Sequence, residues 1–402
     1  MPVFAMPRSP AEWGGAAGLW VTVGGWAAAS RRAGLPPVVV TPSGLMDETD
    51  CLEATARPTP SAAASRSRIP LAARQFVKDA RLLTLARRRD ASADALVAVT
   101  DAPSFVWQHH ELAHRAGVRI ADRYDVPLIE YVHAPIVWEA RRWGVTRPLY
   151  GGLLERVAEL PQLRRADLVA CVSAEVAEEV ARLGVAEERL LVSPMAIDPE
   201  RFDPAVDSTV WRERFERLGS FVVGWMGSFR RFHALDSAFH AMKHLAGQGL
   251  DIGLVLIGDG QDRGRLEALA SELGIADRVM FVGQVGTLEM PAALGALDAA
   301  LLTAEKGQSF HYSPHKLREY MAMELPVAAP AIGEIARFLD DEQTALMYEA
   351  GDTRGLADAI RRLADDVVLR RSLGARGRAK VLEVATWDVV LGGALARIGL
   401  SR

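Results

Sequence analysis

The stretch at residues 309–330, SFHYSPHKLREYMAMELPVAAP, joins a charged helical pattern directly to a short apolar run. Ser313 is a favourable residue at a helix N-cap, and Pro314 suits the first helical turn. The pattern therefore predicts a helix over about 314–323, followed by a buried strand.

The charged residues of this helix indicate an anion-binding role. Lys316 and Glu319 are three positions apart, so they share one helix face. A cation in the first turn is unfavourable to the helix dipole unless something negative binds nearby, and the free N–H groups at that end favour a phosphate. Glu319 could accept hydrogen bonds from two neighbouring hydroxyls, such as those of a ribose. A simple ion pair on a solvated face would explain the same spacing.

Short apolar runs alternate with helical patterns on both sides of this stretch, which is typical of parallel sheets covered on both faces. The expected strands are, in the first half, VFAM, PPVVVTP, either DALVAVT or FVWQ, PLIEYV and LVACVS, and in the second half FVVGWMG, IGLVLIGDG, RVMFVGQ, AALLTA and PVAAP. Helices are expected at 176–184 and 265–274. The 402 residues suggest two domains, with a proline- and acid-rich hinge at 194–208. We predict an α/β fold of two Rossmann-like, doubly wound domains, 1–200 and 201–385, which face a central cleft.

The bulk composition narrows the classes of function. The net charge is −4, so there is no global basic field for nucleic acid. Cys51 and Cys171 are the only cysteines, which is too few for a disulfide scaffold and fits a reducing cytoplasm. No apolar run reaches the roughly 18–20 residues of a membrane span, and the first residues lack the pattern of a signal peptide. We therefore expect a cytoplasmic protein without a transmembrane segment.

The loops after the strands hold the candidate site, because ligands of doubly wound sheets bind at the carboxyl ends of the strands. After FVVGWM, Gly227 would let a ligand approach the backbone closely. Arg230 and Arg231 offer planar forks for a diphosphate. Gly258 follows the next strand in a Gly-Asp-Gly turn, which by itself is only weak evidence for a ligand.

Histidines and tryptophans gather in the first half. His109, His110 and His114 lie close together after a probable strand, which favours a functional role for at least one, although a lone histidine is more often structural. Six of the nine tryptophans lie before residue 200. An aromatic face can stack on a sugar ring, but core packing explains these tryptophans as well.

In combination and in this order, the motifs of the second half resemble the nucleotide-sugar domain of the family 4 glycosyltransferases, which have the GT-B fold. SPHKLREYMAMELPVAAP is similar to the family stretch Ser-Pro-x-Lys-Leu-x-Glu-Tyr-Met-Ala-x-x-x-Pro-Val, and the resemblance covers about 221–390. GDTRGLADAIRRLADDVVLRRSLGARGRAKV is similar to the family's C-terminal tail, which implies that a final helix, within 386–402, crosses back to the first domain. WQHHELAHRAGVRIADRYDVPLIEYVHAP and DLVACVSAEVAEEV resemble first-half stretches of the family.

The resemblance implies roles for the matching positions. Glu319 would hold the ribose hydroxyls of the donor nucleotide, and Arg230 with Lys316 would hold its diphosphate and act in catalysis. His109 or His110 would lie beside the donor sugar as a catalytic residue. The other implied donor-binding residues are Gly14, Gly15, Gly227, Ser228, Arg231, His233, Gly258, Val282, Gly283, His311, Tyr312, Ser313 and Leu317. The candidates for acceptor binding are His133, Trp138 and Trp13.

Several positions depart from the family pattern. The family often carries two glutamates eight residues apart, and the first of them is His311 here, while Glu319 is the second. The usual Lys of the loop after FVVGWM is His233, and its partner Arg is Ser228, so Arg230 or Arg231 would have to serve instead. A catalytically inactive relative that acts as a partner protein would carry such replacements.

The expected reaction follows from these residues and from the resemblance. Glycosyl transfer places negative charge on a nucleoside diphosphate, and Arg230, Arg231 and Lys316 could stabilise that charge as it develops. No Asp-x-Asp occurs in the chain, so we predict transfer without a metal ion, and we expect no cofactor. The resemblance implies retention of the anomeric configuration and a nucleotide-sugar donor of the UDP or GDP type. We expect a small polar acceptor, such as a natural product or a saccharide. Another sugar-nucleotide enzyme of this fold, such as an epimerase or a phosphorylase, is a further alternative.

Overall fold

The computed structural model describes residues 1–9, 17–46, 51, 71–97, 102–145, 147–308 and 310–400. The chain forms two compact units. Unit 1 contains Met1–Met195, His311–Ser313 and Trp387–Arg402, and unit 2 contains Ala196–Phe310 and Pro314–Thr386. Both units are therefore assembled from separate stretches of the sequence.

Unit 1 is built on one sheet with the strand order β3-β2-β1-β4-β5-β6-β7. Its strands are β1 Val3–Ala5, β2 Val38–Thr41, β3 Gly44–Met46, β4 Val106–His109, β5 Leu128–Val132, β6 Leu168–Cys171 and β7 Leu190–Val192. All neighbouring strands are parallel except β2 and β3. Every residue of β1, β4, β5 and β6 is buried, as expected for parallel strands that are covered on both faces.

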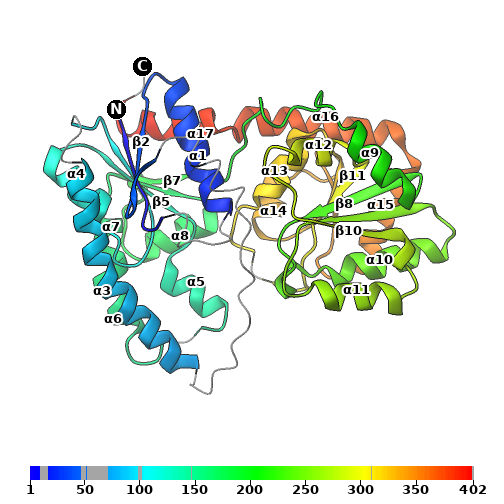
Figure 1. Ribbon diagram of the computed structural model, residues 1–402, viewed down its shortest axis with the longest axis horizontal. Helices are drawn as coiled ribbons and strands as arrows, with labels where there is room; N and C mark the ends of the chain where they lie inside the picture. The colour runs from blue at the N-terminus through cyan, green and yellow to red at the C-terminus, as the bar shows by residue number, and fades with distance from the viewer. Residues whose placement is uncertain are drawn as a thin grey trace. The chain divides into compact units, whose positions relative to one another are not determined.

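The helices of unit 1 come from both ends of the sequence. They are α1 Ala17–Arg32, α3 Leu71–Val97, α4 Ala116–Tyr124, α5 Ile136–Arg142, α6 Gly151–Leu154, α7 Leu160–Arg165, α8 Ala174–Arg182 and α17 Trp387–Arg397. The last of these, α17, packs against α1 near the start of the chain (Figure 1). The contact is close, because a Cβ atom at Gly25 would come within 2.2 Å of the Trp387 ring.

A π-helix at Glu155–Glu159 joins α6 to α7. Pro161 stands at the start of α7 and has no N–H to donate, so a carbonyl one turn earlier loses its helical partner. The Val157 carbonyl accepts instead from the Arg115 guanidinium at 2.9 Å. Single turns of π-helix are frequent at functional sites, and here the turn ends at the fully buried Glu159.

Unit 2 is built on an all-parallel sheet with the order β10-β9-β8-β11-β12-β13. Its strands are β8 Phe221–Met226, β9 Ile252–Ile257, β10 Val279–Gly283, β11 Ala299–Leu301, β12 Val327–Pro330 and β13 Leu346–Tyr348. Its helices are α9 Thr209–Phe215, α10 Asp236–Gly247, α11 Arg263–Glu272, α12 Met290–Gly295, α13 His315–Ala322, α14 Gly333–Phe338, α15 Thr353–Asp365 and α16 Val367–Val384. In this 3-2-1-4-5-6 order the direction of winding reverses between β8 and β11, which is where ligands of such sheets bind.

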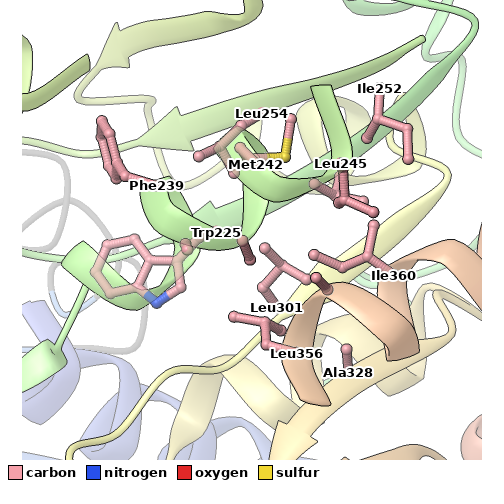
Figure 2. Packing of buried hydrophobic residues seen from close by; sticks show 14 of the residues in the cluster. Trp225, Phe239, Met242, Leu245, Ile252, Leu254, Leu301, Ala328, Leu356 and Ile360 are labelled. Atoms are coloured by element: carbon pink, nitrogen blue, oxygen red, sulfur yellow. The ribbon is translucent and has the colours of Figure 1, made fainter. Parts of the chain in front are cut away.

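The core of unit 2 lies between the sheet and the neighbouring helices α10 and α15 (Figure 2). Met242 and Leu245 of α10, Leu356 and Ile360 of α15, and Leu301 of β11 all belong to this cluster, and the two helices are in contact. All five side chains are almost completely buried. This packing fixes the central strands, and with them the loops at the switch point.

Most of the expected elements are present. The strands predicted from apolar runs are all found, and of the two alternatives FVWQ forms β4, whereas 94–97 lie in α3. The helices predicted at 176–184 and 265–274 correspond to α8 and α11 and begin slightly earlier. Three strands were not predicted, namely β3, β7 and β13; each has only three residues and lies at an edge of its sheet.

The predicted helix after 313 is confirmed as α13, but the predicted serine cap is wrong. Pro314 occupies the N-cap position, and no side chain caps the helix. The Ser313 hydroxyl instead accepts a hydrogen bond from the Met195 N–H at 3.2 Å. No side chain thus competes with an anion at the N-terminus of α13.

Glu324, just after α13, has the left-handed backbone conformation, with φ of 55°. We expect Glu324→Gly to raise the free energy of unfolding by about 0.5–1 kcal/mol, because glycine adopts this conformation without strain. Urea denaturation of both proteins measures the difference. Glu324→Ala is the control, since it removes the long ion pair with Arg378, at 3.8 Å, without relieving the backbone. A stability gain of equal size in both variants would contradict the explanation.

Candidate functional site

The loops at the switch point of unit 2 bring three of the predicted glycines together. The Gly227 N–H, after β8, donates to the Ile257 carbonyl at 2.9 Å, and the Gly258 N–H, after β9, donates to the Gly283 carbonyl at 2.7 Å. All three glycines have positive φ, and a Cβ atom at Gly258 would come within 2.0 Å of the Gly227 carbonyl oxygen. Only glycine allows this backbone packing. Beside Gly283 there is open space, because a Cβ atom at that position would meet no described atom within 4 Å.

Lys316 reaches this glycine backbone from the first turn of α13. Its Nζ lies 3.7 Å from the centre of the Trp225 ring, which is a cation–π contact. A Cβ atom at Gly227 would come within 2.8 Å of the same Nζ. Lys316 forms no ion pair within the described part of the chain. Burial lowers the pKa of Lys316 to about 7, although Glu319 partly offsets the effect.

Trp225 is a site residue that the motif analysis did not single out. Besides Lys316 on its face, it has the His233 ring edge-on at 5.3 Å. Burial, together with the charges of Lys316 and Arg230, lowers the pKa of His233 to about 2. His233 is therefore neutral at physiological pH and does not replace the charge of the lysine that the family carries there. The sequence did hold a signal for Trp225: it lies two residues before Gly227, and residues two apart along a strand lie on the same face of the sheet.

The two arginines of this loop are positioned differently from Lys316. Ser228, Arg230 and Arg231 are exposed, whereas Phe229, which lies between Ser228 and Arg230, is buried. A flexible, solvated arginine can reach an anion, but it is not held in place beforehand. Of the predicted cations, Lys316 is thus the one that the fold positions.

Glu319 is buried on α13 and has a partner that the spacing analysis did not predict. Its Oε1 lies 3.0 Å from His315 Nδ1, one turn earlier on the same helix. Burial alone would raise the pKa of Glu319, but His315, and then Arg201 and Lys316, hold it below its usual range. Glu319 is therefore a carboxylate, which only accepts hydrogen bonds. Leu317 is fully buried, and Val282 is half-buried at the end of β10.

In unit 1, the two adjacent histidines after Gln108 have different surroundings. His109 ends β4, at the switch point between β1 and β4, and its ring lies 5.1 Å from the ring of His133. Burial, with the neighbouring histidines, lowers the pKa of His109 well below its usual value. His109 is therefore a neutral imidazole next to a second imidazole.

His110 lies between two buried glutamates. Its Nδ1 is 2.8 Å from Glu130 Oε1, and its Nε2 is 3.1 Å from Glu159 Oε1. Burial alone would lower the pKa of His110, but the hydrogen bonds to Glu130 and Glu159 raise it to about 10. Both ring nitrogens are thus engaged, so the structure leaves His110 no nitrogen for a ligand. Of the two predicted alternatives, His109 is the one that remains.

Glu159 links His110 to the start of α5. Its carboxylate also accepts from the backbone N–H groups of Ile136 and Val137, the latter at 3.3 Å. No other side chain caps α5. The Glu159 carboxylate therefore contacts both His110, which is next to His109, and the first N–H groups of α5, which begins three residues after His133.

His311 belongs to unit 1, where it contacts α5. Its Nε2 lies 3.2 Å from Glu139 Oε1, and its ring is 4.9 Å from that of Trp138 in an edge-on arrangement. The Arg142 guanidinium covers the Trp138 ring at 4.0 Å. Although burial alone would raise the pKa of Glu139, His311 lowers it. Tyr312 follows with its ring 5.7 Å from that of His311.

Three predicted site residues, Trp13, Gly14 and Gly15, lie outside the described residues. Among the residues that the structure does describe, no group of three His, Cys, Asp or Glu side chains could hold a metal ion.

Comparisons with known proteins agree with the two-unit architecture. Residues 220–366 match the family model described as "Glycosyl transferases group 1", and residues 16–201 match "Glycosyltransferase Family 4". Two solved structures have a similar fold. The first is Anabaena HepE in complex with UDP and glucose, with a TM-score of 0.65, 17% identity and 99% of each chain covered. The second is sucrose-phosphate synthase from Thermosynechococcus elongatus, with a TM-score of 0.67 and 20% identity; the match covers 99% of this chain and 98% of the synthase.

Two curated relatives share more of the sequence. The 2-deoxystreptamine glucosyltransferase of Streptomyces kanamyceticus is 28% identical over 255 residues, which cover 62% of this chain and 59% of the relative. The D-inositol 3-phosphate glycosyltransferase of Xylanimonas cellulosilytica is 28% identical over 287 residues, which cover 68% and 66%. The matches thus span less than two thirds of either relative. The family predicted from the motifs is confirmed: this chain belongs to the family 4 glycosyltransferases and has their GT-B fold.

Proposed function

We propose that this protein transfers a sugar from a nucleoside-diphosphate sugar to a small polar acceptor, such as a natural product or a saccharide. The observation that carries this function is the position of Lys316, on the Trp225 ring and beside Gly227, at the switch point of unit 2. A diphosphate there would meet the lysine ammonium, the glycine backbone and the uncapped N-terminus of α13. These groups favour the negative charge that develops on the leaving nucleotide.

The relatives suggest which donor and acceptor to test first. HepE was solved with UDP and with UDP-glucose, so we propose a donor of the UDP type. The acceptors named for the two curated relatives, 2-deoxystreptamine and D-inositol 3-phosphate, are both small and polar. His133 and Trp138 of unit 1 remain the proposed acceptor contacts, and neutral His109 is the proposed contact to the reacting sugar.

We also propose that the reaction retains the anomeric configuration and requires neither a metal ion nor a cofactor. In this mechanism the leaving phosphate takes the proton of the attacking acceptor hydroxyl, so no pair of catalytic carboxylates is needed. Lys316 stabilises the phosphate charge, with Arg230 and Arg231 as exposed supplements. Product NMR identifies the anomer, and turnover in the presence of EDTA tests the independence from metal.

The function is tested by calorimetry and by slow hydrolysis of UDP-, GDP- and dTDP-sugars with EDTA present. We expect one donor to bind and to turn over. Two replacements, Ser228 and uncharged His233, favour the alternative of an inactive partner protein, because both remove cations that the family carries. Donor binding without any turnover, with the relatives' acceptors present, would support that alternative, and absence of binding would contradict the donor site itself.

Replacing Glu319 by alanine tests the nucleotide end of the site. We expect the donor affinity to fall by about 1–3 kcal/mol, because a buried carboxylate that accepts hydrogen bonds from ribose hydroxyls would be lost. Isothermal titration calorimetry measures the change. Glu272→Ala, at the exposed end of α11, is the matched control and should leave the affinity unchanged. Tight binding that Glu319→Ala does not affect would mean that the nucleoside lies elsewhere.

A further inference from the structure

Exposed apolar side chains gather on unit 1, on α3 and on the helical segment that contains α6. We call Phe76, Val77, Leu149, Leu153 and Val157 the α3–α6 patch. Each keeps at least 50% of its surface exposed. The two parts are in contact, because the Phe76 ring packs edge-on against the ring of Tyr150 at 5.3 Å. A contiguous exposed apolar patch, unlike scattered apolar residues, indicates an interaction surface.

The helical segment is apolar on two faces. Leu153 and Val157 are four residues apart in this helical segment and therefore share one side, and Leu149 lies in the turn just before it. The opposite side buries Leu154 and Ala158 in a small core cluster. A surface helix normally has a polar outer face, so the outer side of this one is expected to contact something apolar.

Leu149 is the most unusual member of the patch. Its side chain is fully exposed, and its backbone has φ of 69°, a left-handed conformation that disfavours a bulky residue. Both features are unfavourable for the protein in water. Both become understandable if this side chain inserts into an apolar medium, since strained residues gather at sites of function.

The surroundings of the patch are basic. Exposed cationic side chains occur on both segments, namely Arg74, Lys78 and Arg81 on α3 and Arg156 on the segment that contains α6. Among the described residues of 73–86 and 147–157, the acidic side chains are Asp79 and the half-buried Glu155. Asp79 is buried and pairs with Arg147 at 2.7 Å. Because the whole chain has a net charge of −4, this basic excess is a local property.

We propose that the α3–α6 patch docks this protein on a lipid bilayer that carries anionic headgroups. The apolar side chains would enter the interface, while the surrounding arginines and Lys78 would lie at the level of the phosphates. A second copy of this chain fits less well, because a twofold interface would bring the same cations together. This is surface attachment, and none of the helices in the described ranges is long and apolar enough to cross the bilayer.

Vesicle co-sedimentation tests this docking independently of the transfer reaction. The full chain should bind vesicles of phosphatidylcholine and phosphatidylglycerol in equal parts, and bind pure phosphatidylcholine far more weakly. The double variant Leu149→Asp/Leu153→Asp should lose about tenfold or more of this binding. The double variant Lys78→Glu/Arg156→Glu should do the same. Val368→Asp, on α16 of unit 2 and also exposed, is the control and should bind as the wild type does.

Circular dichroism shows whether the variants are folded, and their affinity for UDP should be unchanged, since the residues proposed to bind UDP lie on unit 2. Failure of the wild type to bind anionic vesicles would overturn the docking. Equal binding by wild type and both double variants would also overturn it. So would a wild-type dimer, by light scattering, that Leu149→Asp/Leu153→Asp converts to a monomer, because the patch would then be the interface between two copies.

Discussion

Lys316→Met should weaken the binding of a nucleoside-diphosphate sugar about 10- to 100-fold. Methionine keeps the length and the contact with Trp225 but removes the charge-assisted hydrogen bonds that we propose to the diphosphate, which are typically worth about 1.5–3 kcal/mol. Lys316 is the cation that the fold holds ready, with its Nζ 3.7 Å from the Trp225 ring centre. Calorimetry with UDP-glucose measures the loss. Lys243→Met, at an exposed position of α10, is the matched control.

The same lysine should make donor binding depend on pH. The pKa of Lys316 is about 7 in the free protein, so the ammonium is largely charged below pH 7 and largely neutral above it. A diphosphate favours the charged form, so affinity should fall as the pH rises above 7. Binding near pH 8 should also take up a proton.

Titrations at pH 8 in two buffers of different ionisation enthalpy measure that uptake. UDP-glucose is the suitable ligand, because its doubly esterified diphosphate does not titrate in this range. The uptake should disappear in Lys316→Met. Identical binding enthalpies in both buffers for the wild type would contradict the assignment of Lys316 to the diphosphate.

Glu159→Ala should lower the free energy of unfolding of unit 1 by about 3–5 kcal/mol. The substitution takes one of two carboxylates from the buried, charged His110 and leaves the N–H groups of Ile136 and Val137 without their acceptor. Urea denaturation followed by near-ultraviolet circular dichroism measures the change. Glu155→Ala, at the other end of the same π-helix and only half-buried, should have a much smaller effect. Equal losses in both variants would show that the π-helix, rather than the charge network, was disturbed.

This network also predicts how stability depends on pH. The pKa of His110 is raised from 6.5 to about 10, so its contribution is fully present below pH 6.5 and is lost as the pH rises through 10. His110→Gln cannot titrate. The stability difference between wild type and His110→Gln should therefore be large at pH 6 and shrink toward pH 10. A constant difference over this range would mean that His110 is neutral in the folded protein.

The sequence was most informative where one residue type decides the local backbone. Continuous apolar runs predicted the buried strands, since parallel strands covered on both faces tolerate few polar residues. Gly227 and Gly258 marked the ends of β8 and β9, because only glycine permits the approach of one backbone to the other. These signals are local, and so they could be read without knowing the tertiary structure.

The surroundings of the histidines could not be predicted in the same way. His109 and His110 are adjacent, and only the partners of His110 distinguish them. Glu130 comes from the neighbouring strand, and Glu159 lies 49 positions further along the chain, at the end of an irregular helical turn. The contact of His311 with Glu139 spans 172 positions. The resemblance assigned His311 to the donor, and the motif gave no sign of its contact with Glu139 on α5.

The discontinuous composition of the two units limits how this protein can exchange parts with its relatives. A single crossover in the hinge would bring in a new first half but keep the old Trp387 and His311, which must fit Gly25 and Glu139 of the incoming half. A mismatch at Gly25 would be severe, because any larger residue there meets the tryptophan ring. Working chimaeras with relatives should therefore inherit the three stretches of unit 1 as a set. Natural recombination between members of this family is likewise expected to exchange the three stretches of unit 1 together.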